Sequence, residues 1–273
     1  MKTFFAKHSA FLIVLSVSAS LFAQEFQGKA YYFSKTPMNL GSWGATMSEQ
    51  QKKQIAERLK NRLEKTYVLT FNKQASVYKE DEKLDAISGA TDSWGKNFTP
   101  GTQYKNVKTN TFLQAQEFYG KKFLVKDSLM PLKWKLQTES KQIGQYTCFK
   151  ATALIAKSQL SWYSFSWSQL RNNASNANET DTLEEITQVV AWYTPQLPIS
   201  QGPGEYWGLP GLILEVNVND TTILCSKIVI NPEEKIKINA PDKGQQVNKQ
   251  EYKKIIVEKM QEFRNNRTGR RNR

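Results

Sequence analysis

Residues 191–218 read AWYTPQLPISQGPGEYWGLPGLILEVNV and join two strand-like runs through a loop rich in proline, glycine and aromatic residues. Proline cannot donate to a β-ladder, so residues 194–211, the Pro/Gly loop, cannot form a central strand. Gly202-Pro203-Gly204 predicts a turn. Pro210-Gly211 suits the centre of a type II turn, whose second residue needs positive φ. We therefore expect a rigid loop that sets the register of the next strand.

The strand after this loop, LILEVNV, alternates in character. It places Leu212, Leu214, Val216 and Val218 on one face and Glu215 on the other. The following Asn-Asp pair predicts a tight turn, after which TTILCSKIVI returns antiparallel.

Similar alternation recurs along most of the chain, in TYVLTFN, TFLQAQEF, KKFLVKD, LKWKLQTE and YTCFKATALI. Residues 81–103 are polar and predict a long loop. Most connections are too short for parallel crossovers, so the strands should pair antiparallel. The sequence predicts a mainly β (α+β) fold: a strongly curved antiparallel sheet or half-barrel with two amphipathic helices, one across the concave side. A two-sheet β-sandwich is the alternative.

The first predicted helix covers residues 48–65, because Ser48 and Gln51 form a capping box. Its apolar stripe of Ile55, Leu59 and Leu63 is thin, so packing on the sheet is favoured over a helix lying on a membrane surface.

A second predicted helix covers residues 248–264, where Tyr252, Ile255, Ile256, Met260 and Phe263 keep helical spacing. The remaining residues, 265–273, are Arg-rich and predict a basic disordered tail.

The first residues, MKTFFAKHSAFLIVLSVSASLFAQ, combine early lysines, a short apolar run and small residues before Ala23. This pattern is typical of a secretory signal peptide, residues 1–23. A single β-rich domain would follow over residues 24–263. No later apolar run approaches membrane length, so the mature chain should have no transmembrane segment. We expect a periplasmic, extracellular or cell-surface location.

Cleavage would remove His8, the only histidine. Histidine-based triads, the usual zinc sites and a histidine general base would then be excluded. No cofactor or metal motif is found. Removing Lys2 and Lys7 leaves 36 basic and 25 acidic side chains, a net charge of +11. That balance favours anionic envelope partners, while nucleic acid is not expected for an exported protein.

Cys148 and Cys225 would meet an oxidising compartment after export, where they could pair. Their strand patterns permit both on one sheet face, and either a disulfide or two separate thiols remains open.

Aromatic residues flank the Pro/Gly loop and could form a ligand platform; packing at one end of the core is the favoured alternative. The candidate binding residues are Trp192, Tyr193, Pro203, Tyr206, Trp207, Gly208, Pro210 and Gly211.

Residues 208–213 spell GLPGLI, and with AWYTP and GQYTCFKA they make the chain resemble the GLPGLI family of exported Bacteroidetes proteins. The resemblance extends over most of the mature chain. It implies a β-rich exported protein of a family whose genes are often found near those of TonB-dependent outer-membrane receptors, and it carries over no catalytic residue. Asp181-Thr182-Leu183 resembles the short O-glycosylation pattern of such proteins, so Thr182 is a modification candidate.

Three functional hypotheses remain. The first is a non-enzymatic accessory or binding protein of the cell envelope, whose partner is an outer-membrane receptor or an anionic component. The second is a carboxylate-dependent envelope hydrolase using Glu205 and Glu215, with Asp92 as a third candidate. The third is a carrier of a hydrophobic ligand. Enzymatic activity is undecided, and the non-enzymatic hypothesis is favoured.

Overall fold

The computed structural model describes residues 26–81, 97–165, 185–234 and 236–269. The proposed signal peptide, Asp92 and Thr182 lie outside these ranges. Twelve strands form one sheet, in the order β12-β6-β5-β4-β3-β2-β1-β11-β10-β9-β8-β7. In chain order they are Gln27–Lys35 (β1), Glu64–Asn72 (β2), Ala75–Glu80 (β3), Gln103–Asn106 (β4), Thr111–Phe118 (β5), Lys121–Asp127 (β6), Lys135–Ile143 (β7), Tyr146–Ala156 (β8), Ile186–Thr194 (β9), Leu212–Val218 (β10), Thr221–Ile230 (β11) and Gln245–Val247 (β12).

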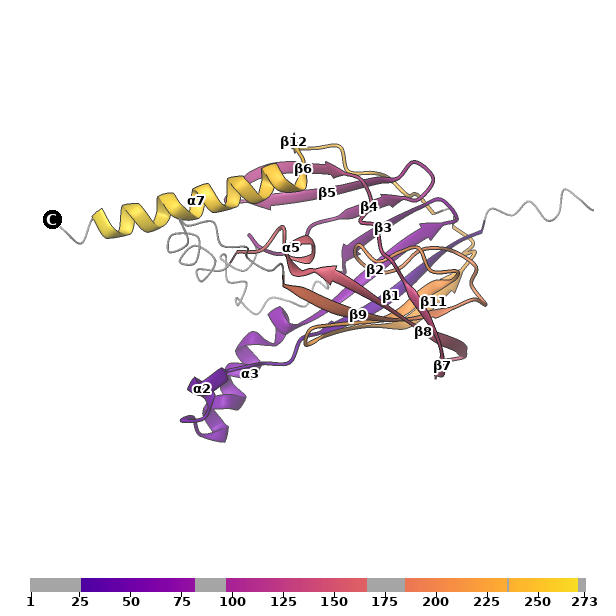
Figure 1. Cartoon of the computed structure of the whole chain (residues 1–273), viewed down its shortest axis with the longest axis horizontal. Coiled ribbons are helices and arrows are strands. Elements are labelled where there is room, and N and C mark those ends of the chain that lie inside the picture. Colours follow the sequence, from indigo (N-terminus) through magenta and orange to yellow (C-terminus); the bar gives the residue numbers. More distant parts are fainter. Residues whose placement is uncertain (1–25, 82–96, 166–184, 235, 270–273) are drawn as a thin grey trace, which may run out of the picture.

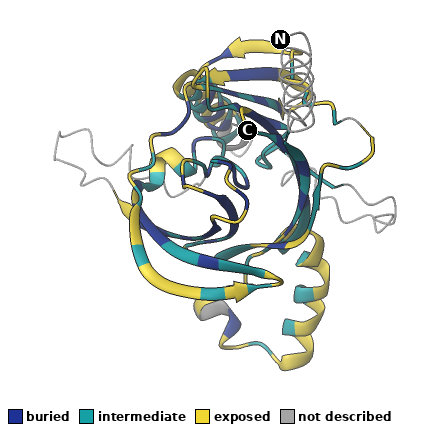
Figure 2. Ribbon diagram, turned by 90° about the vertical axis from the view of Figure 1, so that its right-hand side faces the viewer, coloured by how far each residue is buried: buried dark blue, intermediate teal, exposed yellow. Residues whose placement is uncertain are grey.

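The sheet is strongly curved and open, with β12 and β7 at its two ends (Figures 1 and 2). All paired strands are antiparallel except β12 and β6, which run parallel. The predicted mainly β fold with a curved sheet is confirmed, and the two-sheet sandwich is not formed by the described residues. Figure 2 shows that the segments enclosed by the curve are mostly buried, whereas exposed residues line its outer side.

One row of paired residues crosses the sheet from Leu69 on β2 through Tyr78, Gln103 and Gln114 to Val125 on β6. All five are buried, so this face of β2 to β6 lies inside the curve. Two strands of the sheet were not predicted from the sequence. β4 lacks apolar alternation because its inward residues are polar, and β12 has only three residues.

The C-terminal helix α7, Lys249–Gly269, covers the inner face of β5 and β6 (Figure 1). Its buried residues Tyr252, Ile256 and Met260 pack in one cluster with Phe112 and Phe123. The predicted helix is therefore present, but it continues to Gly269. The predicted disordered tail over 265–273 is therefore wrong for residues 265–269, which continue the helix. Residues 270–273 are not described.

The remaining described helices are α2 (Gly41–Gly44), α3 (Glu49–Leu63) and α5 (Lys157–Leu160). The predicted capping box of α3 is confirmed: the Ser48 hydroxyl accepts from the Gln51 backbone N–H at 3.2 Å, and the Gln51 side-chain oxygen accepts from the Ser48 backbone N–H at 2.9 Å. However, α3 has no buried residue and lies beyond the ends of the strands (Figure 1). Packing of this helix on the sheet was the wrong prediction, because α7 and the Pro/Gly loop pack on the inner face instead.

A β-bulge interrupts the expected alternation of β10. Its register against β9 shifts between Ile213 and Glu215. Leu212 and Leu214 pack in one cluster, while Val216 joins Ile213 in another. The prediction that Val216 shares a face with Leu214 is therefore wrong, because the extra residue of a bulge reverses the order of faces.

Candidate functional site

The Pro/Gly loop lies on the inner face of β3 and β4 and is held there by buried polar groups. The Ser76 hydroxyl donates to the Gln201 side-chain oxygen at 2.7 Å. The Lys105 ammonium donates to two loop carbonyls, those of Gly202 at 2.7 Å and Tyr206 at 2.9 Å. Only 1% of Lys105 is exposed. These contacts explain why polar Ser76 and Lys105 occupy inward positions of β3 and β4: they satisfy the Gln201 side-chain oxygen and two carbonyls of the loop.

The turns within the loop differ from those predicted. The first lies one residue later, because the Tyr206 N–H donates to the Pro203 carbonyl at 3.1 Å and Gly204 has φ +55°. Glu205 therefore occupies the centre of this turn, beside Gly204. Its side chain projects from a backbone that the turn and the Lys105 contacts fix on both sides.

The predicted type II turn at Pro210-Gly211 is wrong, since positive φ occurs at Gly208 (+91°) and not at Gly211. The Gly211 N–H donates to the Leu209 carbonyl at 2.8 Å, which makes a three-residue turn centred on Pro210. Gly211 is required for a different reason. A Cβ there would lie 2.2 Å from the Thr194 carbonyl oxygen, so close approach of two backbone segments selects glycine.

Glu205 is the centre of the candidate site. Its carboxylate accepts a hydrogen bond from the Trp162 indole at 2.7 Å and forms an ion pair with Lys249, the first residue of α7. The side chains of Glu205 and Lys249 are only 11% and 16% exposed. The Lys249 ammonium also lies 4.6 Å from the ring centroid of Phe112 on β5. The carboxylate thus ties the Pro/Gly loop to α7 and to the segment that follows α5.

The charge of Glu205 affects the pKa of neighbouring groups, among them Lys105 and Tyr163. Burial lowers the pKa of Lys105 to about 7, and the Glu205 carboxylate offsets part of that lowering. Burial, with a smaller contribution from Glu205, raises the pKa of Tyr163 to about 12. A lysine that titrates near neutrality beside a carboxylate could move protons. Here, however, the Lys105 nitrogen is enclosed and donates to two carbonyls, so its role is to hold the Pro/Gly loop in place.

Glu215, the second candidate carboxylate, lies elsewhere. It pairs with Lys141 on β7 at 2.7 Å and accepts from the Asn217 side chain at 2.7 Å. It lies on the opposite sheet face from its neighbour Val216, which packs in the cluster that contains Tyr206. Glu205 and Glu215 have no partner in common, so the structure does not bring them together as an acid–base pair.

The aromatic candidates are divided between the two faces of the sheet. Tyr193 and Tyr206 are buried in the same cluster, at 6% and 7% exposure. Trp192 is the neighbour of Tyr193 on β9. The Lys141 ammonium lies over its indole, 4.3 Å from the centroid of the Trp192 ring. Trp207 donates its indole N–H to the Met130 carbonyl at 2.9 Å. These contacts match the packing alternative better than a continuous ligand platform.

The other candidate binding residues border this packing. Pro203 and Gly211 are buried, whereas Gly208 and Pro210 are exposed. Sequence analysis missed Ser76, Lys105, Trp162, Gln201 and Lys249. Polar residues at alternate positions of a strand resemble an exposed face, so Ser76 and Lys105 gave no sign of burial.

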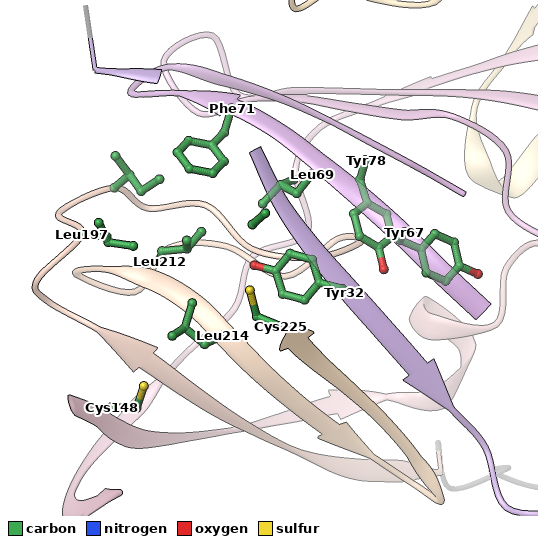
Figure 3. Packing of buried hydrophobic residues seen from close by; sticks show 12 residues of the cluster. Tyr32, Tyr67, Leu69, Phe71, Tyr78, Cys148, Leu197, Leu212, Leu214 and Cys225 are labelled. Carbon is green, nitrogen blue, oxygen red and sulfur yellow. The ribbon is translucent and has the colours of Figure 1, made fainter. Parts of the chain in front are cut away.

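Cys148 on β8 and Cys225 on β11 are separate buried thiols in this structure. Both belong to one core cluster, as Figure 3 shows, but β9 and β10 lie between their strands in the sheet. Burial is the main cause of the raised pKa of each thiol, to about 11 for Cys148 and about 12 for Cys225. Both thiols are therefore protonated and unreactive near neutral pH.

Within the described ranges, no three His, Cys, Asp or Glu side chains are grouped so that they could hold a metal ion. Nor does any described helix combine the length and apolar character needed to span a membrane.

The fold defines a mainly β protein built on one open, curved sheet. Residues 134–215 match the model of a family described as a protein of unknown function (Porph_ging). This stretch holds β7, β8, β9, the Pro/Gly loop and the start of β10. The resemblance expected over most of the mature chain is thus supported for this central part.

No curated protein matches the chain. Among solved structures, it is similar to PNGF-II in the C2 space group (TM-score 0.47, 14% identity) and in the P21 space group (TM-score 0.46, 15% identity). Each likeness covers 85% of this chain and 33% of the other. The chain therefore spans about a third of the length of the structures it matches. We draw no functional conclusion from so distant a likeness.

Proposed function

We propose that this chain is an exported accessory protein of a bacterial cell envelope, and that it acts by binding a partner. One observation carries this proposal: the two candidate catalytic carboxylates are separately engaged, Glu205 by Lys249 and Trp162, and Glu215 by Lys141 and Asn217. Each forms part of the packing that fixes the Pro/Gly loop or the neighbouring sheet. Exposed positions of this loop, among them Gly208 and Pro210, are therefore held in one shape, which lowers the entropy cost of binding.

The signal-peptide pattern, the net basic charge and the family match support this proposal. Cleavage after Ala23 would deliver the chain to the periplasm or the cell surface. The partner would be an outer-membrane receptor of the TonB-dependent class or an anionic envelope component.

Affinity capture from Bacteroidetes envelope extracts tests this function. The full chain is tagged and used at low and high salt, beside an unrelated protein of equal net charge. We expect a defined envelope component that the control protein does not retain. Capture that survives high salt indicates a receptor-like protein contact, whereas loss at high salt indicates a charge-dominated partner. Failure to retain any specific component at either salt contradicts the proposal.

The same protein can be screened for hydrolysis of envelope glycans and peptides, with Glu205→Gln and Glu215→Gln as matched variants. Turnover by the wild type that either substitution abolishes, in a variant that still folds, would favour the hydrolase over a binding function. Native mass spectrometry of protein purified from its own envelope tests the carrier hypothesis, because a transported lipid would appear as added mass.

A further inference from the structure

Residues 36–63 form an appendage that leaves the sheet between two paired strands. β1 ends at Lys35 and β2 begins at Glu64, and these two residues are partners in the ladder. The Thr36 N–H donates to the Leu63 carbonyl at 2.9 Å and closes the base of the excursion. Beyond this point α3 is the lowest helix in Figures 1 and 2, and none of its residues is buried.

The apolar side of α3 is only partly covered by the described residues. Ile55, Leu59 and Leu63 lie four residues apart, so they share one side of the helix, and all three are half-buried. Met38, Leu40 and Met47 in the segment that leads to α3 are also half-buried. A helix that belonged only to the core would bury this side, as α7 does with Tyr252, Ile256 and Met260.

Basic side chains border the apolar side of α3 along both flanks. At 100° per residue, Arg58 and Arg62 fall on one flank of the stripe, and Lys53 and Lys60 on the other. These four side chains are exposed. The helix carries five basic residues and two acidic ones. Glu57 falls on the far side from the stripe, whereas Glu49, in the first turn on the lysine flank, is paired with Lys52 at 2.7 Å. The positive charge is therefore arranged around the apolar residues.

We propose that α3 lies on an anionic lipid surface, with Ile55 and Leu59 directed into the headgroup region and the flanking Arg and Lys side chains paired with lipid phosphates. This inference rests on the proposed envelope location and names the anionic component. A short apolar stripe alone binds a bilayer weakly, so attraction between the basic flanks and anionic headgroups supplies the rest. Long basic side chains suit this position, because their aliphatic stems lie along the apolar region while the charges reach the phosphates.

The test measures binding of the full chain to vesicles by co-sedimentation. Vesicles of phosphatidylcholine alone are compared with vesicles that also contain phosphatidylglycerol. We expect binding only with the anionic lipid, and weaker binding as salt rises. The double variant Arg58→Gln/Lys60→Gln should bind about tenfold more weakly or worse, and Leu59→Gln should also weaken binding. All variants should fold, because α3 has no buried residue.

The matched control is Lys79→Gln/Lys227→Gln, which lowers the net charge equally but changes exposed residues on β3 and β11. It should bind as the wild type does. Equal weakening by the control and the α3 pair would show attraction by overall charge and would overturn the proposal, as would absence of binding to anionic vesicles. The two proposals can fail separately. If the protein binds vesicles but captures no envelope component, the proposed lipid contact of α3 is still supported. If it captures an envelope protein but does not bind vesicles, the proposed lipid contact is contradicted.

Discussion

Lys105 on β4 donates a hydrogen bond to the carbonyl of Tyr206, 101 positions further along the chain, at 2.9 Å. The same ammonium reaches the Gly202 carbonyl at 2.7 Å. One buried lysine thus holds the turn that carries Glu205 at its last residue, Tyr206, and at Gly202, the residue just before it. The most characteristic loop of the sequence therefore depends for its shape on a strand that the sequence did not reveal.

Lys105 should give the protein a characteristic pH dependence. Its pKa is lowered to about 7 in the folded chain from an ordinary 10.5. Between these values the unfolded chain holds a proton that the folded chain has lost, so this group makes the free energy of unfolding rise with pH. Below about pH 7 both states are protonated and the full cost of burying the charge is present.

Urea unfolding of the wild type and Lys105→Met at about pH 6 and about pH 9 measures this effect. The stability of the wild type relative to the variant should increase from the lower to the higher pH. A difference that stays constant across this range would mean that Lys105 does not titrate there.

Removing the charge of Glu205 should be costly, because the Lys249 ammonium, only 16% exposed, would lose its carboxylate partner. We expect Glu205→Gln to lose about 3 kcal/mol of unfolding free energy. The control is Glu64→Gln, whose partner Lys35 is 60% exposed; it should cost less than about 1 kcal/mol. Chemical denaturation of both variants provides the comparison, and similar losses would refute a structural role for the Glu205 pair.

Two buried tyrosines on the same core cluster should respond differently to removal of their hydroxyl groups. The Tyr32 hydroxyl donates to the Ile213 carbonyl at 2.6 Å, whereas the Tyr78 hydroxyl has no hydrogen-bond partner among the described residues. Tyr32→Phe should therefore lose about 1–2 kcal/mol, while Tyr78→Phe should be neutral or slightly stabilising. The melting temperatures of the two variants, each compared with the wild type, measure this difference. A marked loss for Tyr78→Phe would indicate a partner such as a buried water.

Gly211→Ala should be among the most damaging substitutions in the loop. Its Cβ would meet the Thr194 carbonyl, so the backbone must move, and we expect a loss of about 3 kcal/mol or failure to fold. Gly144→Ala is the control: φ is +58° but nothing lies within 4 Å, so only backbone strain of about 1 kcal/mol applies. Equal melting temperatures for the two variants would show that the close approach of Thr194 is not the reason for glycine at position 211.

The helices and strands that were predicted correctly are those specified by the pattern of neighbouring residues in the sequence. Alternating strands such as TTILCSKIVI and the capping box at Ser48 were found because backbone geometry and side-chain spacing are properties of neighbouring residues. The candidate site was found only in part. Glu205 was identified from its loop, but its partners Trp162 and Lys249 come from segments 43 and 44 positions away.

By itself the sequence determined a mainly β chain, a C-terminal amphipathic helix and a loop in which proline and glycine exclude a strand, while it left open a curved sheet or a two-sheet sandwich. Only the tertiary structure decided that the loop folds onto the inner face, that Lys105 is buried there beneath it, that Glu205 is paired with Lys249, and that α3 lies away from the core. The reason is physical. The sequence pattern shows which side of an element is apolar, whereas the partner of a charged side chain or of a half-covered apolar stripe depends on which distant segment the whole fold packs against it.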